Sequence, residues 1–439
     1  MIRINLIILL LLAGIVGFSQ EKTQDTVNVY KKRVLESTEI DFLSSFYTQD
    51  GDNAAVTGGR GTEELKDINP IIVVAIPLND DDVLTIDASI SAYSSASSSN
   101  INPFDGSGKA DPFVASSGAS SKDVLASFTS SYSHNSDDRN KIWSAKFAVS
   151  NEYDYSSIGF GASYTRLFNE KNTELSVDGN VYLDSWKPLY PFELRSFDIG
   201  GSGLNSSLFS DITIVENTKY IPIFNSFDSK SRNSYSLGFG FSQILSKRLQ
   251  MSLALDLVSQ SGLLSTPFHR VYFGDVANFF IEDFHLADAI EQLPDNRFKV
   301  AVGGRLNYYL NELMVVRTFY RYYTDDWGIK SNTASIEIPF KITDYLTLYP
   351  MYRFYNQTAA DYFAPYEMHQ SSEQFYTSDY DLSKFTAHQY GFGVTYTDIF
   401  TKFNIWRLKV KSIDLKINQY ERDSGFKATI ISGGVKFVL

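Results

Sequence analysis

The chain has 439 residues, a net charge of −12 and no cysteine, and aromatic residues make up 15% of it. The acidic balance argues against a nucleic-acid partner. The lack of cysteine excludes disulfides, thiolate catalysis, cysteine-bound zinc and a lipid-modified cysteine anchor.

The N-terminal segment has the pattern of a secretory signal. Arg3 precedes the apolar run Leu6–Val16, which is too short to cross a membrane as a helix. We predict a signal peptide over residues 1–19, a short periplasmic lead-in over 20–33 and one β-barrel over 34–439.

Segments that alternate apolar and polar side chains recur to the last residue. In Ser234–Ser242, Tyr235, Leu237 and Phe239 point one way, while serine and glycine point the other. The other clear segments are Leu84–Tyr93, Ile158–Leu167, Leu175–Leu183, Met251–Leu257, Phe298–Tyr309, Thr333–Phe340, Tyr390–Tyr396 and Trp406–Ile417. The pattern predicts an all-β fold, a transmembrane antiparallel up-and-down β-barrel of about 16 strands.

Short and long connections alternate between these segments. The short ones are Asn79–Asp82, His134–Asn140, Asn169–Asn172, Ser246–Arg248, Asn311–Glu312 and Thr343–Asp344. The long ones are Asp50–Glu64, Ser94–Ser121, Ser185–Asn233, Ser259–Asn296 and Asn356–Thr386. Short periplasmic turns and long extracellular loops are typical of bacterial outer-membrane barrels, so we expect the protein in that membrane and in contact with its lipid.

The C-terminus supports the same location. Ile431, Val435, Phe437 and Leu439 alternate to the final residue, an ending that resembles the signal by which the barrel-assembly machinery recognises its clients. We therefore expect that machinery as a partner during biogenesis.

Charges on the predicted inner face are unevenly distributed. An acidic wall is predicted in the first half of the chain, from Asp41, Asp87, Asp178 and Asp184. A basic wall is predicted in the second half, from Arg305, Arg317, Arg321, Arg353, Arg407 and Lys409. Opposed walls would create a transverse field across a water-filled pore, a device for solute selection. Alternatively, these charges pair with one another or with an inward-folded loop and plug the lumen.

The connection Ser94–Ser121 is the candidate for an inward-folded constriction. Its proline and glycine residues favour a compact loop, in which Asp105 and Asp111 would supply acidic groups. An ordinary surface loop is the alternative.

Chemistry for catalysis is weak. His269 and His285 share an outer loop with several acids that together could bind a metal or activate water, namely Asp275, Glu282, Asp283 and Asp288. No metal-ligand spacing such as HExxH is present. We therefore assign no catalytic residue, metal or cofactor, and we expect the protein not to be an enzyme; a surface hydrolase is the least favoured hypothesis.

Three stretches resemble a known family: Leu35–Leu43 (LESTEIDFL) continuing through Asp50–Gly59 (DGDNAAVTGG), Asp111–Gly118 (DPFVASSG) and Asn180–Pro188 (NVYLDSWKP). The family consists of uncharacterised Bacteroidota outer-membrane proteins, classified as a domain of unknown function. Members are often encoded beside thioredoxin-like proteins, small lipoproteins and flavin transferases, so the resemblance implies a link to an extracytoplasmic redox system. It carries no catalytic residue.

These observations predict a channel for small polar or anionic solutes. The alternative is a plugged barrel that serves as a scaffold for an outer-membrane complex, in which a periplasmic or surface protein would be the partner.

Overall fold

The computed structural model describes residues 32–95, 123–198, 200–210, 213–215, 219–227, 230–281 and 283–439. By its contacts the chain divides into Met1–Arg33 and Val34–Leu439, and the second unit carries every element given below. The predicted signal peptide lies outside the described residues, and so does the predicted constriction with Asp105 and Asp111.

The second unit is built around one antiparallel sheet of 18 strands. Two of these, β17 (Phe340–Lys341) and β20 (Asn404–Ile405), have only two residues, which leaves 16 strands to form the wall. The first nine are β1 (Glu39–Asp50), β2 (Leu65–Pro77), β3 (Asp82–Ser95), β4 (Asp123–Asn135), β5 (Lys141–Asn151), β6 (Tyr155–Phe168), β7 (Thr173–Trp186), β8 (Ser231–Ser246) and β9 (Leu249–Gly262). The other seven are β14 (Asn296–Tyr309), β15 (Val315–Asp325), β16 (Lys330–Glu337), β18 (Leu346–Gln357), β19 (Phe385–Thr397), β21 (Leu408–Arg422) and β22 (Lys427–Val438).

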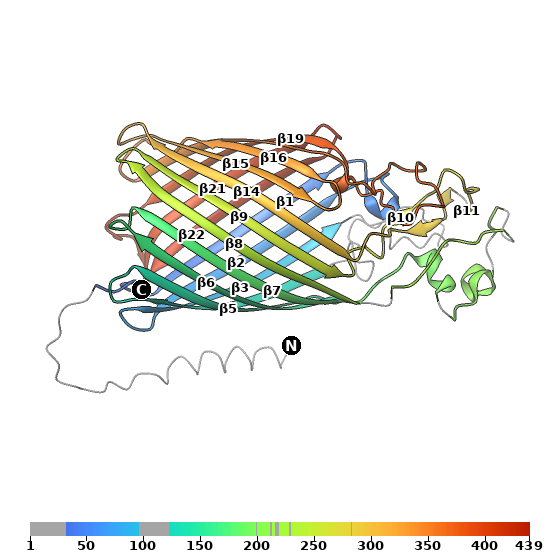
Figure 1. The fold of residues 1–439 in the computed structure, drawn as a ribbon, viewed down its shortest axis with the longest axis horizontal. Coiled ribbons are helices and arrows are strands. Elements are labelled where there is room, and N and C mark those ends of the chain that lie inside the picture. The colour runs from blue at the N-terminus through green and yellow to red at the C-terminus, as the bar shows by residue number, and fades with distance from the viewer. Residues whose placement is uncertain are drawn as a thin grey trace. The chain divides into compact units, whose positions relative to one another are not determined.

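Each wall strand pairs with its neighbours in chain order, and β1 also pairs with β22, so the sheet closes into the predicted barrel (Figure 1). Closure removes the exposed edge that an open sheet would present. Among the described residues, no helix is long and apolar enough to cross a membrane.

The wall strands show the alternation of apolar and polar side chains that the sequence predicts. On β8 the outward side chains Tyr235, Leu237 and Phe239 are 41–44% exposed, whereas Gly238 between them is buried on the inner face. Large apolar side chains that stay exposed along one face of nearly all the wall strands form the surface that lipid covers. The protein is therefore an outer-membrane barrel, as predicted.

The connections also divide as predicted. Short turns join the strands at the rim where β22 ends, and long connections leave the opposite rim. Exposed aromatic side chains mark the short-turn rim, where a girdle at the membrane interface is expected: Trp143, Tyr309, Tyr345, Phe400, Phe403 and Trp406.

The predicted strand Trp406–Ile417 is wrong at its start. Trp406 has a φ of 57° and forms the turn between β20 and β21, so the wall strand begins at Leu408. A register shift between Val410 and Ser412 then changes which face each residue occupies.

Four long connections fold into a packed cap at the outer rim. Its elements are the short helices η2 (Ala55–Thr57), η4 (Phe192–Phe197), η5 (Gly203–Asn205), η6 (Ser207–Phe209) and η7 (Tyr380–Leu382), with the strand pairs β10 (Arg270–Val271) with β13 (Ala289–Ile290) and β11 (Phe280–Ile281) with β12 (Phe284–His285). Leu194 and Tyr272 belong to one of several buried apolar clusters in it. We use the name cap for the described residues of these four connections, 51–64, 187–230, 263–295 and 358–384.

A fully buried arginine joins three of the cap connections. The Arg270 guanidinium donates to both carboxylate oxygens of Glu193 at 2.7 and 3.0 Å and to the carbonyl of Val56 at 2.9 Å. Removing one partner of a buried ion pair leaves an uncompensated charge and strongly destabilises the fold. These contacts therefore fix the arrangement of the connections.

Candidate functional site

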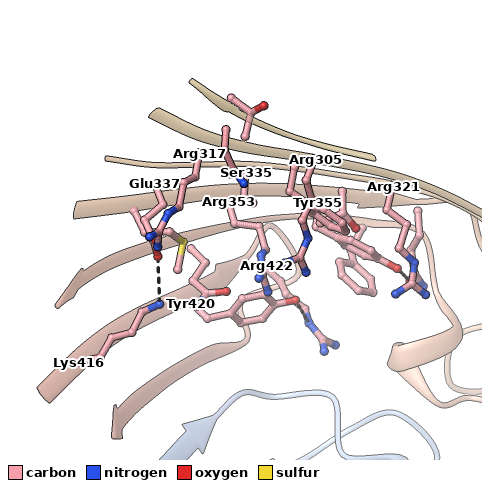
Figure 2. Close-up of a pocket in the computed structure, with 18 of the residues that line it drawn as sticks. Arg305, Arg317, Arg321, Ser335, Glu337, Arg353, Tyr355, Lys416, Tyr420 and Arg422 are labelled. Atoms are coloured by element: carbon pink, nitrogen blue, oxygen red, sulfur yellow. Dashed lines mark hydrogen bonds and ion pairs between the residues drawn. The ribbon is translucent and has the colours of Figure 1, made fainter. Parts of the chain in front are cut away.

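A cavity of about 970 Å³ lies against the inner face of β14, β15, β16, β18, β19 and β21. Six basic side chains line it, and only two carboxylates do. The basic ones are Arg305, Arg317, Arg321, Arg353, Lys416 and Arg422; the carboxylates are Glu337 and Asp381. Figure 2 shows the basic side chains projecting from the wall into the same space.

The register explains how residues far apart in sequence share this cavity. Arg305 of β14 is paired with Phe319, which is paired with Ser335, which is paired with Arg353 of β18. Paired residues on neighbouring strands point to the same face, so one row crosses four strands and puts the two arginines about 14 Å apart at their Cα atoms. Arg321 is the next inward residue of β15 toward the outer rim.

Three of the basic groups are neutralised locally. Arg317 Nη1 lies 2.9 Å from Glu337 Oε1, and Lys416 Nζ lies 3.8 Å from Oε2 of the same carboxylate. Arg422 Nη1 donates to Asp381 Oδ1 at 2.7 Å, which joins the wall to η7 of the cap.

The contacts of Arg305, Arg321 and Arg353 differ from those of the three paired side chains. In the part of the chain that the structure describes, none of these three guanidinium groups has a carboxylate within 4 Å. Arg305 stacks over Phe319 at 5.2 Å, which leaves its N–H donors free for another group. Three uncompensated cations on one wall repel each other and attract an anion, and a guanidinium can bind a carboxylate or phosphate with two parallel hydrogen bonds.

The carboxylates of the predicted acidic wall differ from one another in their surroundings. The strand pairings place Asp41, Asp87, Asp178 and Asp184 on the inner face. However, β1 adjoins β22, and Asp41 Oδ2 lies 3.4 Å from Lys436 Nζ, so this carboxylate belongs to an ion pair at the closure. Asp87 on β3 lies half a circumference from β15, the arrangement that opposed walls require.

Two members of the predicted basic wall are not beside the others. Arg407 is in the turn before β21, over the Trp406 ring, and Lys409 lies at the short-turn end of β21, before the register shift. Beyond that shift Ile413 and Leu415 face outward, so Lys416 faces the lumen.

Lys416 and Arg422 were missed from the sequence for different reasons. Strict alternation starting from Arg407 gives the wrong face for every residue beyond the register shift, because the bulge adds one residue to β21. The predicted segment ends at Ile417, whereas β21 extends to Arg422. The outward run Ile413, Leu415, Ile417 would have given the correct face.

The acidic residues grouped with His269 and His285 do not assemble around them. Asp275 accepts hydrogen bonds from the N–H and hydroxyl of Ser371. Asp288 accepts one from the Phe273 N–H, and burial raises its pKa to about 6. Glu282 lies outside the described residues. His285 is stacked between the rings of Tyr272 and Phe280.

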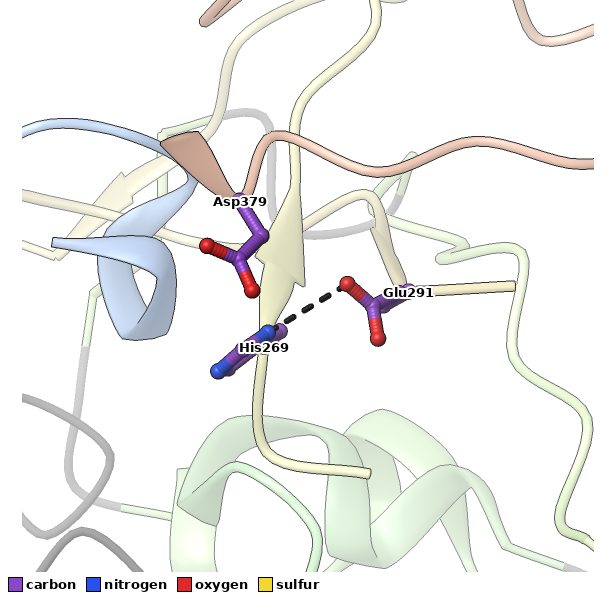
Figure 3. Close-up of side chains that lie close together, drawn as sticks. All are labelled: His269, Glu291 and Asp379. Atoms are coloured by element: carbon purple, nitrogen blue, oxygen red, sulfur yellow. Dashed lines mark hydrogen bonds and ion pairs between the residues drawn. The ribbon is translucent and has the colours of Figure 1, made fainter. Parts of the chain in front are cut away.

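Instead, His269 lies beside two carboxylates that come from separate parts of the cap. One ligand atom each of His269, Glu291 and Asp379 lies within 4.8 Å of the others, and Figure 3 shows the three side chains converging. Burial and the neighbouring Asp381 carboxylate raise the pKa of Asp379 to about 7. Of these three residues, only His269 was a candidate from the sequence. Asp379 comes from a different connection, and sequence spacing cannot place it beside the histidine.

Comparison with known proteins identifies one family. A family model described as a protein of unknown function, DUF3570, matches residues 12–434. No curated protein gives a significant match.

Solved structures similar to this fold are outer-membrane proteins. A bacterial polysaccharide outer membrane secretin matches with a TM-score of 0.46 and 9% identity over 92% of this chain and 98% of its own. A BenF-like porin from Pseudomonas fluorescens Pf-5 matches with a TM-score of 0.40 and 8% identity over 92% and 98%. A loop-deletion mutant of OmpT, an outer membrane protein of Vibrio cholerae, matches with a TM-score of 0.39 and 8% identity over 91% and 100%.

Proposed function

The chain belongs to the DUF3570 family of proteins of unknown function, and we propose that it is an outer-membrane channel for small anionic solutes. The observation that carries this proposal is the row of lumen arginines without carboxylate partners. A plug held by ion pairs would consume these charges, whereas a solute site leaves them available.

The size of the cavity suits a small solute. A space of about 970 Å³ is at the upper end of the range for small-molecule sites. Among its aromatic side chains, Phe319, Tyr355 and Tyr420 provide flat surfaces beside the guanidinium groups. A solute with a carboxylate or phosphate and a compact organic part would satisfy both kinds of side chain.

Charge reversal at Arg321 tests the proposal. In a planar bilayer with a salt gradient, Arg321→Glu should shift the reversal potential toward cation selectivity, because a lumen cation becomes an anion. Arg353→Glu should shift it in the same direction. An unchanged reversal potential in both variants would contradict the assignment of these arginines to the conducting path.

The matched control is Lys171→Glu. Lys171 is an exposed residue of the short turn 169–172, so this variant has the same change in net charge as Arg321→Glu but outside the lumen. It should leave the reversal potential close to that of the wild type at physiological salt, where charges are screened within about 8 Å.

The packed cap favours a second candidate function, a closed barrel that holds a protein complex. Three connections share buried contacts through Arg270, and η7 of the fourth is attached to the lumen wall through Asp381 and Arg422. This hypothesis predicts a non-conducting barrel that co-purifies with a partner protein in gentle detergent. A monodisperse solitary barrel under those conditions would count against it.

A further inference from the structure

We propose that His269, Glu291 and Asp379 form a binding site for a first-row divalent cation such as Zn²⁺, which holds two connections of the cap together. His269 and Glu291 come from the connection between β9 and β14, and Asp379 comes from the connection between β18 and β19. The inference concerns the cap alone and does not depend on what the lumen conducts.

The donor set fits such a cation. One imidazole nitrogen and two carboxylate oxygens are ligands that Zn²⁺ accepts in proteins, with a further position open to water. Each residue offers one of these atoms, and the three atoms lie within 4.8 Å of one another. Ligands of a tetrahedral ion with bonds of 2.0–2.1 Å are separated by about 3.3 Å.

The His269–Glu291 contact already has that separation. His269 Nδ1 lies 3.3 Å from Glu291 Oε2. A charge-assisted hydrogen bond between these groups would ordinarily be about 2.7–2.9 Å long, so the contact is long for a hydrogen bond and matches two ligands of one ion. Asp379 Oδ1 accepts from the Asp381 N–H at 2.9 Å, which leaves Oδ2 without a hydrogen-bond partner among the described residues.

The charges of the ionised cluster also favour a cation. In the described part of the chain, neither Glu291 nor Asp379 has a lysine or arginine within 4 Å. The adjacent cation, Arg270, is bound to Glu193 instead. When both carboxylates are ionised, a single histidine faces two negative charges, one of them buried, and even when protonated it leaves a negative charge that a divalent ion would neutralise.

Hydrogen bonds orient Glu291 as they orient metal ligands. Its Oε1 accepts from the Thr266 N–H at 2.6 Å, and its Oε2 accepts from the Thr377 hydroxyl at 2.5 Å. Thr377 lies two residues before Asp379, and its Oγ1 accepts from the Asp379 N–H at 3.0 Å. One threonine thus positions both carboxylate ligands, which is the role of the groups that surround a metal centre.

The test is Zn²⁺ binding to the full-length protein in detergent after removal of metal with a chelator. Isothermal titration with Zn²⁺ alone should give one site per chain. Asp379→Asn and His269→Gln should each abolish this site, and Thr377→Val should weaken Zn²⁺ binding by about 10–100-fold because it removes only the orienting hydroxyl. X-ray absorption at the zinc edge should show nitrogen and oxygen ligands including an imidazole.

Glu373→Gln is the matched control. Glu373 Oε2 lies 2.6 Å from His369 Nδ1, so it is a second histidine–carboxylate pair in the same cap, outside the cluster. This variant should bind Zn²⁺ like the wild type. The proposal is overturned if the folded, metal-free wild type takes up no stoichiometric Zn²⁺, or if Asp379→Asn and His269→Gln, with wild-type circular dichroism, bind it unchanged.

Discussion

At the scale of single residues, the partner of each ionisable side chain decides its role more than its type does. Arg270 and Arg305 are both arginines on the inside of the molecule. Arg270 is buried with Glu193 and stabilises the cap, whereas Arg305 faces the lumen and has no carboxylate within 4 Å among the described residues. The residue type alone predicts a charged interior, and only the three-dimensional neighbours separate structural from functional charges.

Asp288 gives a pH prediction at this scale. Burial raises its pKa to about 6, with contributions from the Glu367 and Asp275 carboxylates, so the folded cap binds a proton that the open cap releases between about pH 4 and 6. The stabilisation from this group is present below pH 4 and is lost as the pH rises through 6, by at most about 3 kcal/mol.

Hydrogen exchange checks this prediction. Protection of the Val271–Phe273 amides, corrected for the intrinsic exchange rate, should fall between pH 4.5 and pH 7. Asp288→Asn keeps an acceptor for the Phe273 N–H and removes the titration, so its protection should change less over this range. An equal pH dependence in the two proteins would assign the effect to other groups.

At the scale of strands, period-two alternation predicts the wall because lipid covers one face and water the other. Leu255 and Ala254 are adjacent on β9 and occupy opposite faces: Ala254 is in register with the inward residues Gly240 and Gly303. The same substitution at the two positions should therefore have unequal effects.

Leu255→Lys should destabilise the barrel by about 2–4 kcal/mol, since it places an ammonium group on the lipid face near the membrane midplane. Ala254→Lys places the same group on the lumen face, away from lipid, and should cost much less. Urea unfolding in lipid vesicles measures both. Equal destabilisation by the two variants would contradict the assignment of the faces.

The strands that the sequence did not predict correctly show the limit of alternation. The bulge of β21 reverses the faces within one strand, and no residue between Leu408 and Ser412 signals it. The resulting error concealed Lys416, whereas Arg407 was misplaced because it lies in the turn before the strand begins. A periodic pattern can be extended only as far as the register is unbroken.

At the scale of the whole molecule, the closed order of strands was predictable, whereas the cap was not. The alternation of short and long connections follows from the membrane, which requires antiparallel strands, and an even number of strands places both ends of the barrel on one side. The cap depends on contacts between connections that are far apart in sequence, such as Arg270 with Val56, and on side chains that have no periodic pattern. For this reason the sequence placed His269 in an acidic outer loop but could not select Glu291 and Asp379 as its neighbours.

The same contrast applies to the lumen. The basic character of the second half of the barrel was visible in the sequence, whereas the pairing of Arg317 with Glu337 depends on the register between β15 and β16. That pairing separates the arginines that stabilise the wall from those that remain available, and the channel proposal rests on the second group.

The most direct test of the central claim is the conductance of the purified wild-type protein in a planar bilayer, with ion selectivity measured in a salt gradient. The account predicts steady single-channel conductance with a preference for anions, set by Arg305, Arg321 and Arg353. A correctly inserted barrel that stays silent, or one that prefers cations, would contradict it.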